Sequence, residues 1–168
     1  MSEADEAAFR AFAHSRRPGL RRTAFLMCGD WHQADDLVQA ALTKLYVAWR
    51  RVRSNEAPDA YVRQILTRCF LDERRRPWRR ESPVEDISDQ PSSAGPADEA
   101  ALDLRAALAL LPPRQRATVV LRFWADASVT ETADALGCSE GTVKSQTARA
   151  ITALRSLLND PVLAEEMS

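Results

Sequence analysis

Side chains able to hydrogen-bond to DNA bases or phosphates gather in residues 129–155, VTETADALGCSEGTVKSQTARAITALR. This segment has helix-turn-helix spacing: Ala133 is small where two helices would cross, Gly137 allows a tight turn, and Val143 is apolar where the second helix would pack on the first. No acid follows Glu140 within the segment, so the second helix can enter a major groove without repelling phosphate. We expect this helix to expose Thr142, Lys144, Ser145, Gln146 and Arg149 for such contacts. The alternative is a helical hairpin whose polar face is only solvated.

A second group of residues suited to nucleic acid is an arginine cluster around Trp78. Arginines neutralise phosphates, and an aromatic ring can stack on an unpaired base. A charged run at a helix end is as often simply solvated, and Trp78 is as readily packed as stacked. The net charge of −1 hides the cluster, because residues 63–80 hold seven arginines whereas residues 81–99 hold six acids and no base. The cluster consists of Arg74, Arg75, Arg76, Arg79 and Arg80.

Residue types typical of catalysis are sparse and poorly placed. His14 and His32 are the only histidines, and their separation matches neither a metal site nor a nucleophile with its base. The five glycines are scattered, so no phosphate-binding loop is evident. Asp35 and Asp36 are adjacent, and neighbouring helix residues point in different directions. The sequence therefore predicts neither an enzyme nor a bound metal or cofactor.

The cysteines and the hydropathy favour a protein that works inside the cell. Cys28, Cys69 and Cys138 are an odd number at wide spacing, so we expect buried thiols instead of disulfides. The first residues are acidic and lack an apolar core segment, and no apolar run is long enough to span a membrane. The composition, 45% hydrophobic and 28% charged, is that of a globular protein. We therefore expect a cytoplasmic protein without a membrane partner.

The spacing of apolar residues predicts helices that would position both groups. From Phe9 to about Trp78 the pattern is helical, and a third helix is expected to start near Pro58. That third helix should bury Tyr61, Ile65, Leu66, Cys69 and Phe70. The clearest stripe of apolar residues, at spacings of three and four, comprises Trp31, Ala34, Val38, Ala41, Leu42, Leu45 and Trp49. The polar side chains on the other face of the same helix are Asp35, Asp36, Gln39 and Lys44.

A linker and a second helical unit should follow. Residues 81–97 are rich in proline, serine and acid and have no sustained apolar period, so they cannot build a core. Helices are expected from about Asp98 to Leu111 and, after Pro112-Pro113, through Trp124. Ser128 and Glu131 have capping-box spacing, Gly137 would end one short helix, and Ser139 would cap the next, which runs to about Leu158. The chain is thus predicted to be all-α, with two small helical domains joined by a flexible acidic linker that would let them move.

The order of these parts resembles the extracytoplasmic-function sigma factors. ADDLVQAALTKLY is followed by a helix ending in arginines, a linker, and LPPRQRATVVLRFWADASVTETADALGCSEGTVKSQTARAITALRSLL. AYVRQIL and the arginine-rich stretch after it are similar to the actinobacterial SigE-family subgroup. The resemblance implies sigma domain 2 over residues 1–80, a linker over 81–97, sigma domain 4 over 98–158 and a tail over 159–168. It also implies a non-catalytic protein that binds core RNA polymerase, through the clamp helices and flap, and promoter DNA; an anti-sigma factor is a further possible partner.

The same resemblance assigns roles to individual residues. The helix that docks on the clamp helices of the large polymerase subunit would use Asp35, Asp36, Leu37, Gln39 and Lys44. The minus-ten element, with a flipped base near the loop at Asn55, would meet Asn55, Arg63, Thr67, Arg68, Arg74, Arg75, Arg76 and Trp78. Unpairing a base costs a few kcal/mol, which a pocket and arginines must offset. The helix-turn-helix residues would read the minus-thirty-five element, and the acidic linker would thread toward the RNA path of the polymerase.

Several positions depart from the family pattern. Ala40 stands where such helices commonly have glutamate, Thr67-Arg68 stand where asparagine is frequent, and Ala148 stands where an aromatic residue occurs. Residues 81–97 are too short and polar to fold as the third domain of primary sigma factors, and this absence points to the extracytoplasmic-function class.

Two other interpretations remain open from the sequence. A helix-turn-helix regulator that binds duplex DNA without polymerase would explain residues 129–155, but it leaves the arginine cluster of the first half without a purpose. A nucleic-acid-processing enzyme would require metal-dependent turnover, for which the sequence offers no carboxylate or histidine cluster of suitable spacing.

Overall fold

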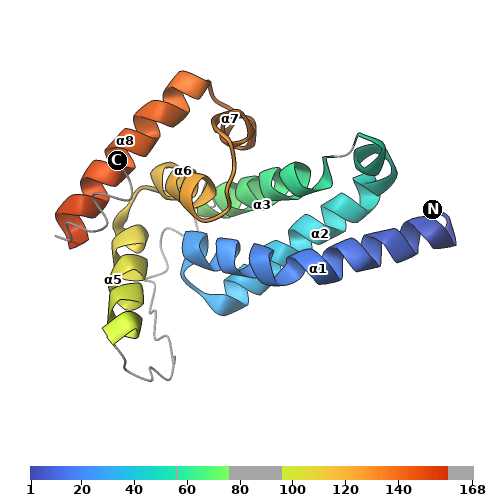
Figure 1. Cartoon of the computed structure of the whole chain (residues 1–168), viewed down its shortest axis with the longest axis horizontal. Helices are drawn as coiled ribbons and strands as arrows, with labels where there is room; N and C mark the ends of the chain where they lie inside the picture. Colours follow the sequence, from blue (N-terminus) through green and yellow to red (C-terminus); the bar gives the residue numbers. More distant parts are fainter. Residues whose placement is uncertain (56, 76–95, 159–168) are drawn as a thin grey trace.

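The computed structural model describes residues 1–55, 57–75 and 96–158, the last with side chains from residue 103 onward. Every regular element in these ranges is a helix, which confirms the all-α prediction (Figure 1). The helices are α1 (Glu3–Cys28), α2 (Trp31–Ser54), α3 (Pro58–Arg75), α5 (Pro96–Leu110), α6 (Pro113–Phe123), α7 (Val129–Leu136) and α8 (Glu140–Leu158). Arg76, Trp78, Arg79, Arg80, most of the predicted linker and the predicted tail lie outside the described residues.

The N-terminal half, α1 to α3, is a three-helix unit built around α2. The apolar stripe predicted for α2 is confirmed, because all of its members except the partly buried Trp31 lie in the core. Phe9 and Phe12 of α1 pack on the Trp49 ring at centroid distances of 5.5 and 5.4 Å. The predicted apolar face of α3 is likewise buried, apart from the partly buried Tyr61.

Local capping determines where these helices begin and end. Ser2 and Asp5 form a reciprocal capping box at the start of α1, and Asp30 accepts the first amides of α2. Between them, Gly29 ends α1 with φ of 78°, a left-handed conformation that favours glycine. Tight caps at both ends of this connection make α1 and α2 a helical hairpin.

The C-terminal half contains α5 to α8, with α7 and α8 as the helix-turn-helix. Gly137 ends α7 with φ of 65°, and the Ser139 hydroxyl accepts the Thr142 amide at 3.1 Å, so both predicted signals are confirmed. Ala133 and Val143 are buried where the two helices cross. α5 begins at Pro96, two residues earlier than predicted, because proline is well tolerated in a first helical turn.

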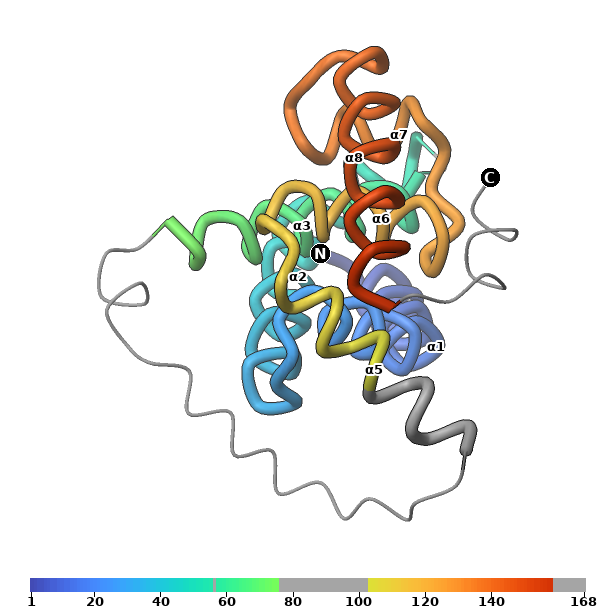
Figure 2. The backbone as a smooth tube through the Cα atoms, turned by 90° about the vertical axis from the view of Figure 1, so that its left-hand side faces the viewer, coloured from blue at the N-terminus to red at the C-terminus, as the bar shows by residue number. Residues whose placement is uncertain are grey.

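The two halves are in direct contact. Figure 2 shows α6 and α7 lying over the N-terminal half, and residue contacts join α3 to α7 and α1 to both α5 and α6. The buried guanidinium of Arg116 in α6 donates to the Met27 carbonyl of α1 at 2.6 Å, and Arg105 of α5 lies 4.3 Å from the centre of the Phe25 ring. The structure therefore shows the halves joined by specific contacts in addition to the linker.

Three further observations bear on function. Cys28 and Cys69 are buried thiols as predicted, whereas Cys138 is only half-buried. Among the described residues, none of the helices is both long and apolar enough to cross a membrane. The same ranges contain no group of three or more His, Cys, Asp or Glu side chains placed to hold a metal ion.

Candidate nucleic-acid and polymerase interfaces

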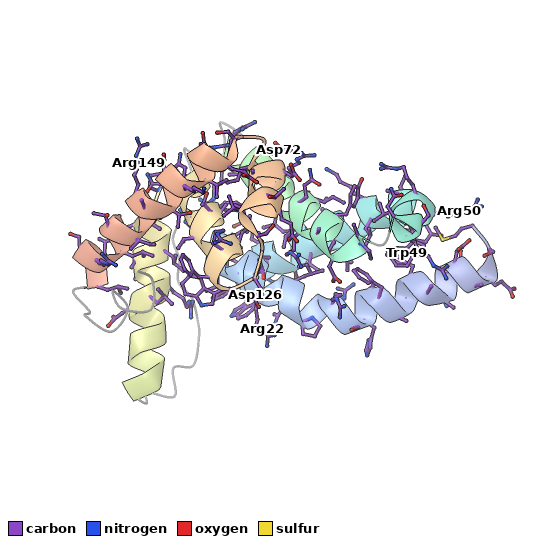
Figure 3. The ribbon with its side chains drawn as sticks, turned by 45° about the horizontal axis from the view of Figure 1, so that its top comes forward. Arg22, Trp49, Arg50, Asp72, Asp126 and Arg149 are labelled. Carbon is purple, nitrogen blue, oxygen red and sulfur yellow. The ribbon has the colours of Figure 1, made fainter. Side chains whose placement is uncertain are left out.

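The helix α8 presents a polar face to solvent. Val143, Ala150 and Leu154 anchor its other face in the core of the C-terminal half. The exposed predicted residues are Thr142, Lys144, Ser145 and Arg149. Arg149 projects outward from the helix (Figure 3). This face has the shape and charge needed to enter a DNA major groove.

Gln146 is the one predicted residue of α8 that the structure turns partly inward. It lines a pocket of about 350 Å³ between the start of α6 and the end of α3, together with Arg74, Arg75 and Arg114. Its Oε1 is buried and has no hydrogen-bond partner among the described groups. Gln146 therefore lies apart from the exposed residues of α8 and beside arginines that the sequence assigned to the other half.

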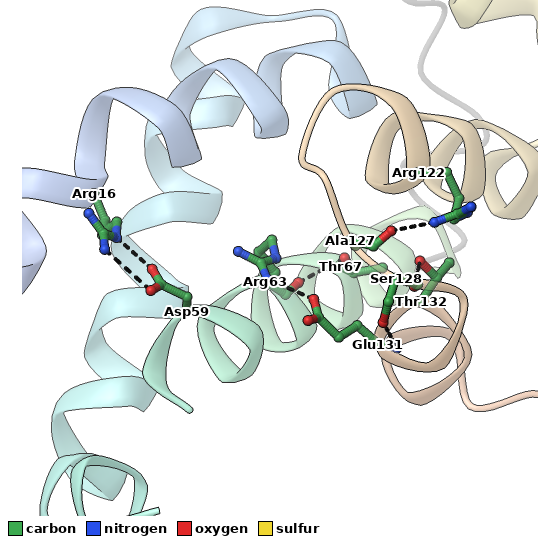
Figure 4. Close-up of polar contacts among 9 residues, drawn as sticks. All are labelled: Arg16, Asp59, Arg63, Thr67, Arg122, Ala127, Ser128, Glu131 and Thr132. Carbon is green, nitrogen blue, oxygen red and sulfur yellow. Dashed lines mark hydrogen bonds and ion pairs between the residues drawn. The ribbon is translucent and has the colours of Figure 1, made fainter. Parts of the chain in front are cut away.

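The first helix of the motif, α7, has a half-formed capping box. The Ser128 hydroxyl accepts the Glu131 amide at 3.0 Å, as predicted. The Glu131 carboxylate does not return to the backbone of Ser128 but pairs with Arg63 of α3, with Nη2 and Oε2 2.7 Å apart (Figure 4). Arg63, from the N-terminal half, thus binds the Glu131 carboxylate that a complete capping box would direct to the Ser128 amide.

The predicted minus-ten residues on α3 lie beneath α7. The Arg68 guanidinium and the Gln64 amide both donate to the Asp134 carbonyl of α7, at 3.1 and 3.3 Å. Thr67 has no exposed surface, and its hydroxyl donates to the Arg63 carbonyl one turn earlier. The expectation that Thr67 contacts DNA does not match this structure, because its only polar atom is buried and already bonded.

The remaining predicted minus-ten residues are differently placed. Arg74 donates to the Cys28 carbonyl at 3.3 Å and lies over the Phe70 ring, whereas Arg75 is exposed. Asn55, exposed at the end of α2, lines a pocket of about 230 Å³ whose opposite wall includes Glu131 and Asp134 of α7. Arg76 and Trp78 lie outside the described residues.

The outer face of α2 carries the predicted polymerase contacts. Asp36, Gln39 and Lys44 are exposed, while Asp35 is paired with Arg21 at 2.6 Å. Leu37 is a correction: it is 2% exposed and packs in the core, since it lies three residues after Ala34 on the buried stripe. The prediction omitted Val47, which is 83% exposed on the same helix and adds an apolar side chain to this outer face.

Arg116 is a structurally important residue that the sequence did not single out. Its guanidinium also donates to the carbonyls of Ala109 and Leu111, at 3.2 and 2.9 Å, near the C-terminal end of α5. Burial, together with the charge of Arg74, lowers its pKa from 12.5 to about 10. The guanidinium thus bonds the C-terminal carbonyls of two helices, one from each half.

Comparison with known proteins places these two units in one family. The model for Sigma-70 region 2 matches residues 5–80, and the model for Sigma-70, region 4 matches residues 101–154. Together they account for both the helix that ends in arginines and the helix-turn-helix.

Relatives that match most of the chain are also sigma factors. The RNA polymerase sigma-E factor of Streptomyces coelicolor is 35% identical over 156 residues, which cover 89% of this chain and 85% of that one. ECF RNA polymerase sigma factor SigM of Mycobacterium tuberculosis is 32% identical, with 92% and 79% covered. The sigma factor RpoE of Bartonella quintana, solved in complex with the anti-sigma factor NepR, superposes with a TM-score of 0.75 at 25% identity, covering 90% of this chain and 97% of that one.

The fold and the two matched units define a transcription initiation factor made of sigma regions 2 and 4. The chain belongs to the RNA polymerase sigma factors of the extracytoplasmic-function type, which bind core RNA polymerase and direct promoter-specific initiation.

Proposed function

We propose that this sigma factor reads the minus-thirty-five element with the exposed face of α8. The observation that carries the proposal is the basic and polar surface formed by Lys144, Ser145 and Arg149, on a helix with no acid after Glu140. Arginine and lysine can bond guanine edges or phosphates, and nothing on this face would repel the DNA backbone. Thr142, at the start of the helix, is placed to contact the adjoining phosphates.

The minus-ten element is proposed to meet the surface formed by α3 and the end of α2. Arg63, Arg68, Arg74 and Arg75 supply positive charge, and Asn55 lines the pocket that would hold an unpaired base. Arg76 and Trp78 extend the same surface in sequence. Thr67 acts in this proposal as a helix-stabilising residue.

The polymerase surface is proposed to be the outer face of α2, with Asp36, Gln39 and Lys44 around the exposed Val47. Charged groups around an apolar contact are typical of protein interfaces. Leu37 supports this face from the core. Contact between the C-terminal half and the polymerase flap remains a prediction from the family.

Three finer points complete the proposal. The protein has no catalytic activity of its own and works in the cytoplasm, where core RNA polymerase acts. Because RpoE of Bartonella quintana was solved with the anti-sigma factor NepR, an anti-sigma factor is also proposed as a partner here.

In-vitro transcription on a pool of promoter-like duplexes tests the proposal, with core RNA polymerase present and the protein added or left out. Start sites that depend on the protein are expected, and their shared upstream sequences would give the promoter. If no start site appears while the protein alone shifts duplex DNA, the regulator interpretation replaces this one.

The polymerase surface has its own test in Asp36→Arg. Reversing an exposed charge at an interface should weaken binding to core polymerase about tenfold or more, with no loss of helix content by circular dichroism. Asp103→Arg, an equal charge change at an exposed position of α5, is the matched control and should bind as the wild type does. Unchanged affinity of the Asp36 variant would contradict the assignment of α2.

A further inference from the structure

A small cavity lies where the C-terminal end of α1 meets side chains of α3, α5 and α6. Its volume is about 160 Å³, several times that of one water molecule, which occupies about 30 Å³ in the liquid. Three arginines line it, each from a different helix: Arg74 of α3, Arg105 of α5 and Arg116 of α6. The other described residues that line it, Phe25 and Ala109 among them, include no acid. The cavity therefore gathers positive charge beside uncharged groups.

The backbone offsets only part of this charge. Arg74 and Arg116 donate to carbonyls at the C-terminal ends of α1 and α5. Each helix end carries about half an elementary negative charge, so two ends offset about one of the three guanidinium charges. Asp30 and Glu73, the acids that flank the lining residues in sequence, are hydrogen-bonded to the start of α2. A positive excess is left in the cavity.

The pKa of Arg116 reflects the same imbalance. Burial and then the charge of Arg74 lower it to about 10, and no carboxylate of the described residues is among the charges that act on it. The two guanidinium groups lie over the same Phe70 ring, at 5.6 and 5.8 Å from its centre. An anion between them would remove this repulsion.

Two of the arginines also have donors to spare. The Nε atoms of Arg74 and Arg116 are buried and have no hydrogen-bond partner among the described groups. Arg116 is only 6% exposed, so its Nε is shielded from bulk solvent. Buried donors without acceptors are unfavourable. A water molecule can accept such hydrogen bonds, but only an anion also balances the charge.

The arrangement fits a tetrahedral oxyanion better than a carboxylate. A carboxylate offers two acceptor oxygens in one plane, whereas phosphate offers oxygens in several directions and carries up to two charges. Guanidinium groups that arrive from three helices can each bond a different phosphate oxygen. The volume admits one phosphate group, so a nucleotide can enter only by its phosphate end.

We propose that this cavity is a binding site for a phosphate group, held by the guanidinium groups of Arg74, Arg105 and Arg116. Because the ligand binds the folded chain, the stability of the protein should rise with the phosphate concentration. The site does not depend on the assignment of α3 to the minus-ten element. Arg74 belongs to that proposed surface as well, so the variants below leave it unchanged.

A phosphate titration of the free, full-length protein tests the site. Phosphate replaces chloride at constant ionic strength, because phosphate also stabilises proteins without a site when it is excluded from their surface. Calorimetry should show saturable binding of one ion per chain. In the same titration, the NMR resonance of the Arg116 Nε–H should shift along the same saturation curve. Binding that does not saturate, or that leaves this resonance unmoved, would overturn the proposal.

Arg105→Gln separates a specific site from general attraction to a basic protein. Loss of one charge-assisted hydrogen bond should weaken phosphate binding about tenfold or more, with helix content retained by circular dichroism. Arg17→Gln, an equal charge change at an exposed position of α1, is the matched control and should bind within about twofold of the wild type. Equal weakening by both substitutions would mean that no built site exists.

Ala109→Glu tests the charge of the cavity without removing an arginine. The new carboxylate, on an exposed residue that lines the cavity, should act as a tethered anion and block phosphate. Without phosphate, its urea midpoint should exceed that of Ala109→Gln, which has nearly the same shape and no charge. Equal midpoints and equal phosphate binding for the two variants would refute the anion site.

Adenosine monophosphate identifies the source of the phosphate group. If the natural ligand is a small phosphorylated molecule, this nucleotide should displace inorganic phosphate and shift the same Arg116 resonance at a lower concentration. A shift with inorganic phosphate alone would assign the site to the free ion. If neither ligand moves the resonance but a short single-stranded DNA does, the cavity serves the nucleic-acid backbone and the proposal is wrong.

Discussion

Replacement of Arg116 is expected to destabilise the whole fold, because this side chain links both halves. Its guanidinium donates to carbonyls of Met27, Ala109 and Leu111, at 2.6, 3.2 and 2.9 Å. Three hydrogen bonds from a charged donor contribute about 1.5–3 kcal/mol each. Against this, lowering the pKa from 12.5 to about 10 corresponds to a burial cost of about 3 kcal/mol. We therefore expect Arg116→Ala to lower the free energy of unfolding by about 3 kcal/mol.

Arg116→Met separates hydrogen bonding from packing. Methionine restores apolar contact beside the Phe70 ring, over which the guanidinium lies at 5.8 Å, but it leaves the carbonyls at the ends of α1 and α5 without their donor. We expect Arg116→Met to lower the free energy of unfolding by about 2 kcal/mol, measured by urea denaturation. Circular dichroism and tryptophan fluorescence should report the same transition, which is the condition for a two-state treatment. A loss below about 0.5 kcal/mol for the methionine variant would refute the reasoning, because packing alone would then explain the site.

Three further predictions concern DNA, backbone and pH. Arg149→Ala should weaken promoter binding by the holoenzyme about 10- to 100-fold and, if the contact is to phosphate, reduce the salt slope by about one; unchanged binding in a salt titration would remove Arg149 from the interface. Gly137→Ala should lower the free energy of unfolding by about 1 kcal/mol, because φ is 65° there, whereas Gly141→Ala within α8 should raise it by about 0.5 kcal/mol. Equal effects of the two substitutions on the urea midpoint would contradict this argument from backbone conformation. Burial raises the pKa of the Cys28 thiol to about 11, so the stability it contributes should be complete below pH 9 and lost as the pH approaches 11. Urea unfolding of wild type and Cys28→Ala should show that their difference in free energy of unfolding shrinks as the pH rises from 9 to 11. A difference that stays constant over this range would contradict the prediction.

The sequence predicted the elements of this protein well because their signals are local. The apolar stripe of α2, the left-handed turn at Gly137 and the cap at Ser139 depend on residues within one or two helical turns. The burial of Leu37 could also have been predicted from the sequence, because Leu37 lies between Ala34 and Val38 of the apolar stripe. The family resemblance alone assigned its side chain to an interface. The error at Leu37 therefore came from giving the resemblance more weight than the apolar spacing of the helix.

The contact between the halves had no local signal. Thr67 lies outside the apolar stripe of α3, and it is buried because α3 is packed by four other helices, including α6 and α7. Glu131 has the spacing of a capping box, which fits a purely local role, and only the approach of Arg63 redirects its carboxylate. Such pairings depend on how two units dock, which periodicity within either unit does not specify.

The arginines show why a basic cluster alone does not define a DNA surface. Arg68, Arg74 and Arg116 each donate to a carbonyl in the last turn of a helix, on α7 or α1. A guanidinium serves a helix terminus as well as a phosphate, because both present oxygen acceptors with negative charge. The two uses compete, so any of these arginines that contacts promoter DNA must first leave its carbonyl or share its remaining donors. For Arg116 the competition is decided by burial, whereas Arg68 is exposed and donates to the Asp134 carbonyl from one of its two terminal nitrogens.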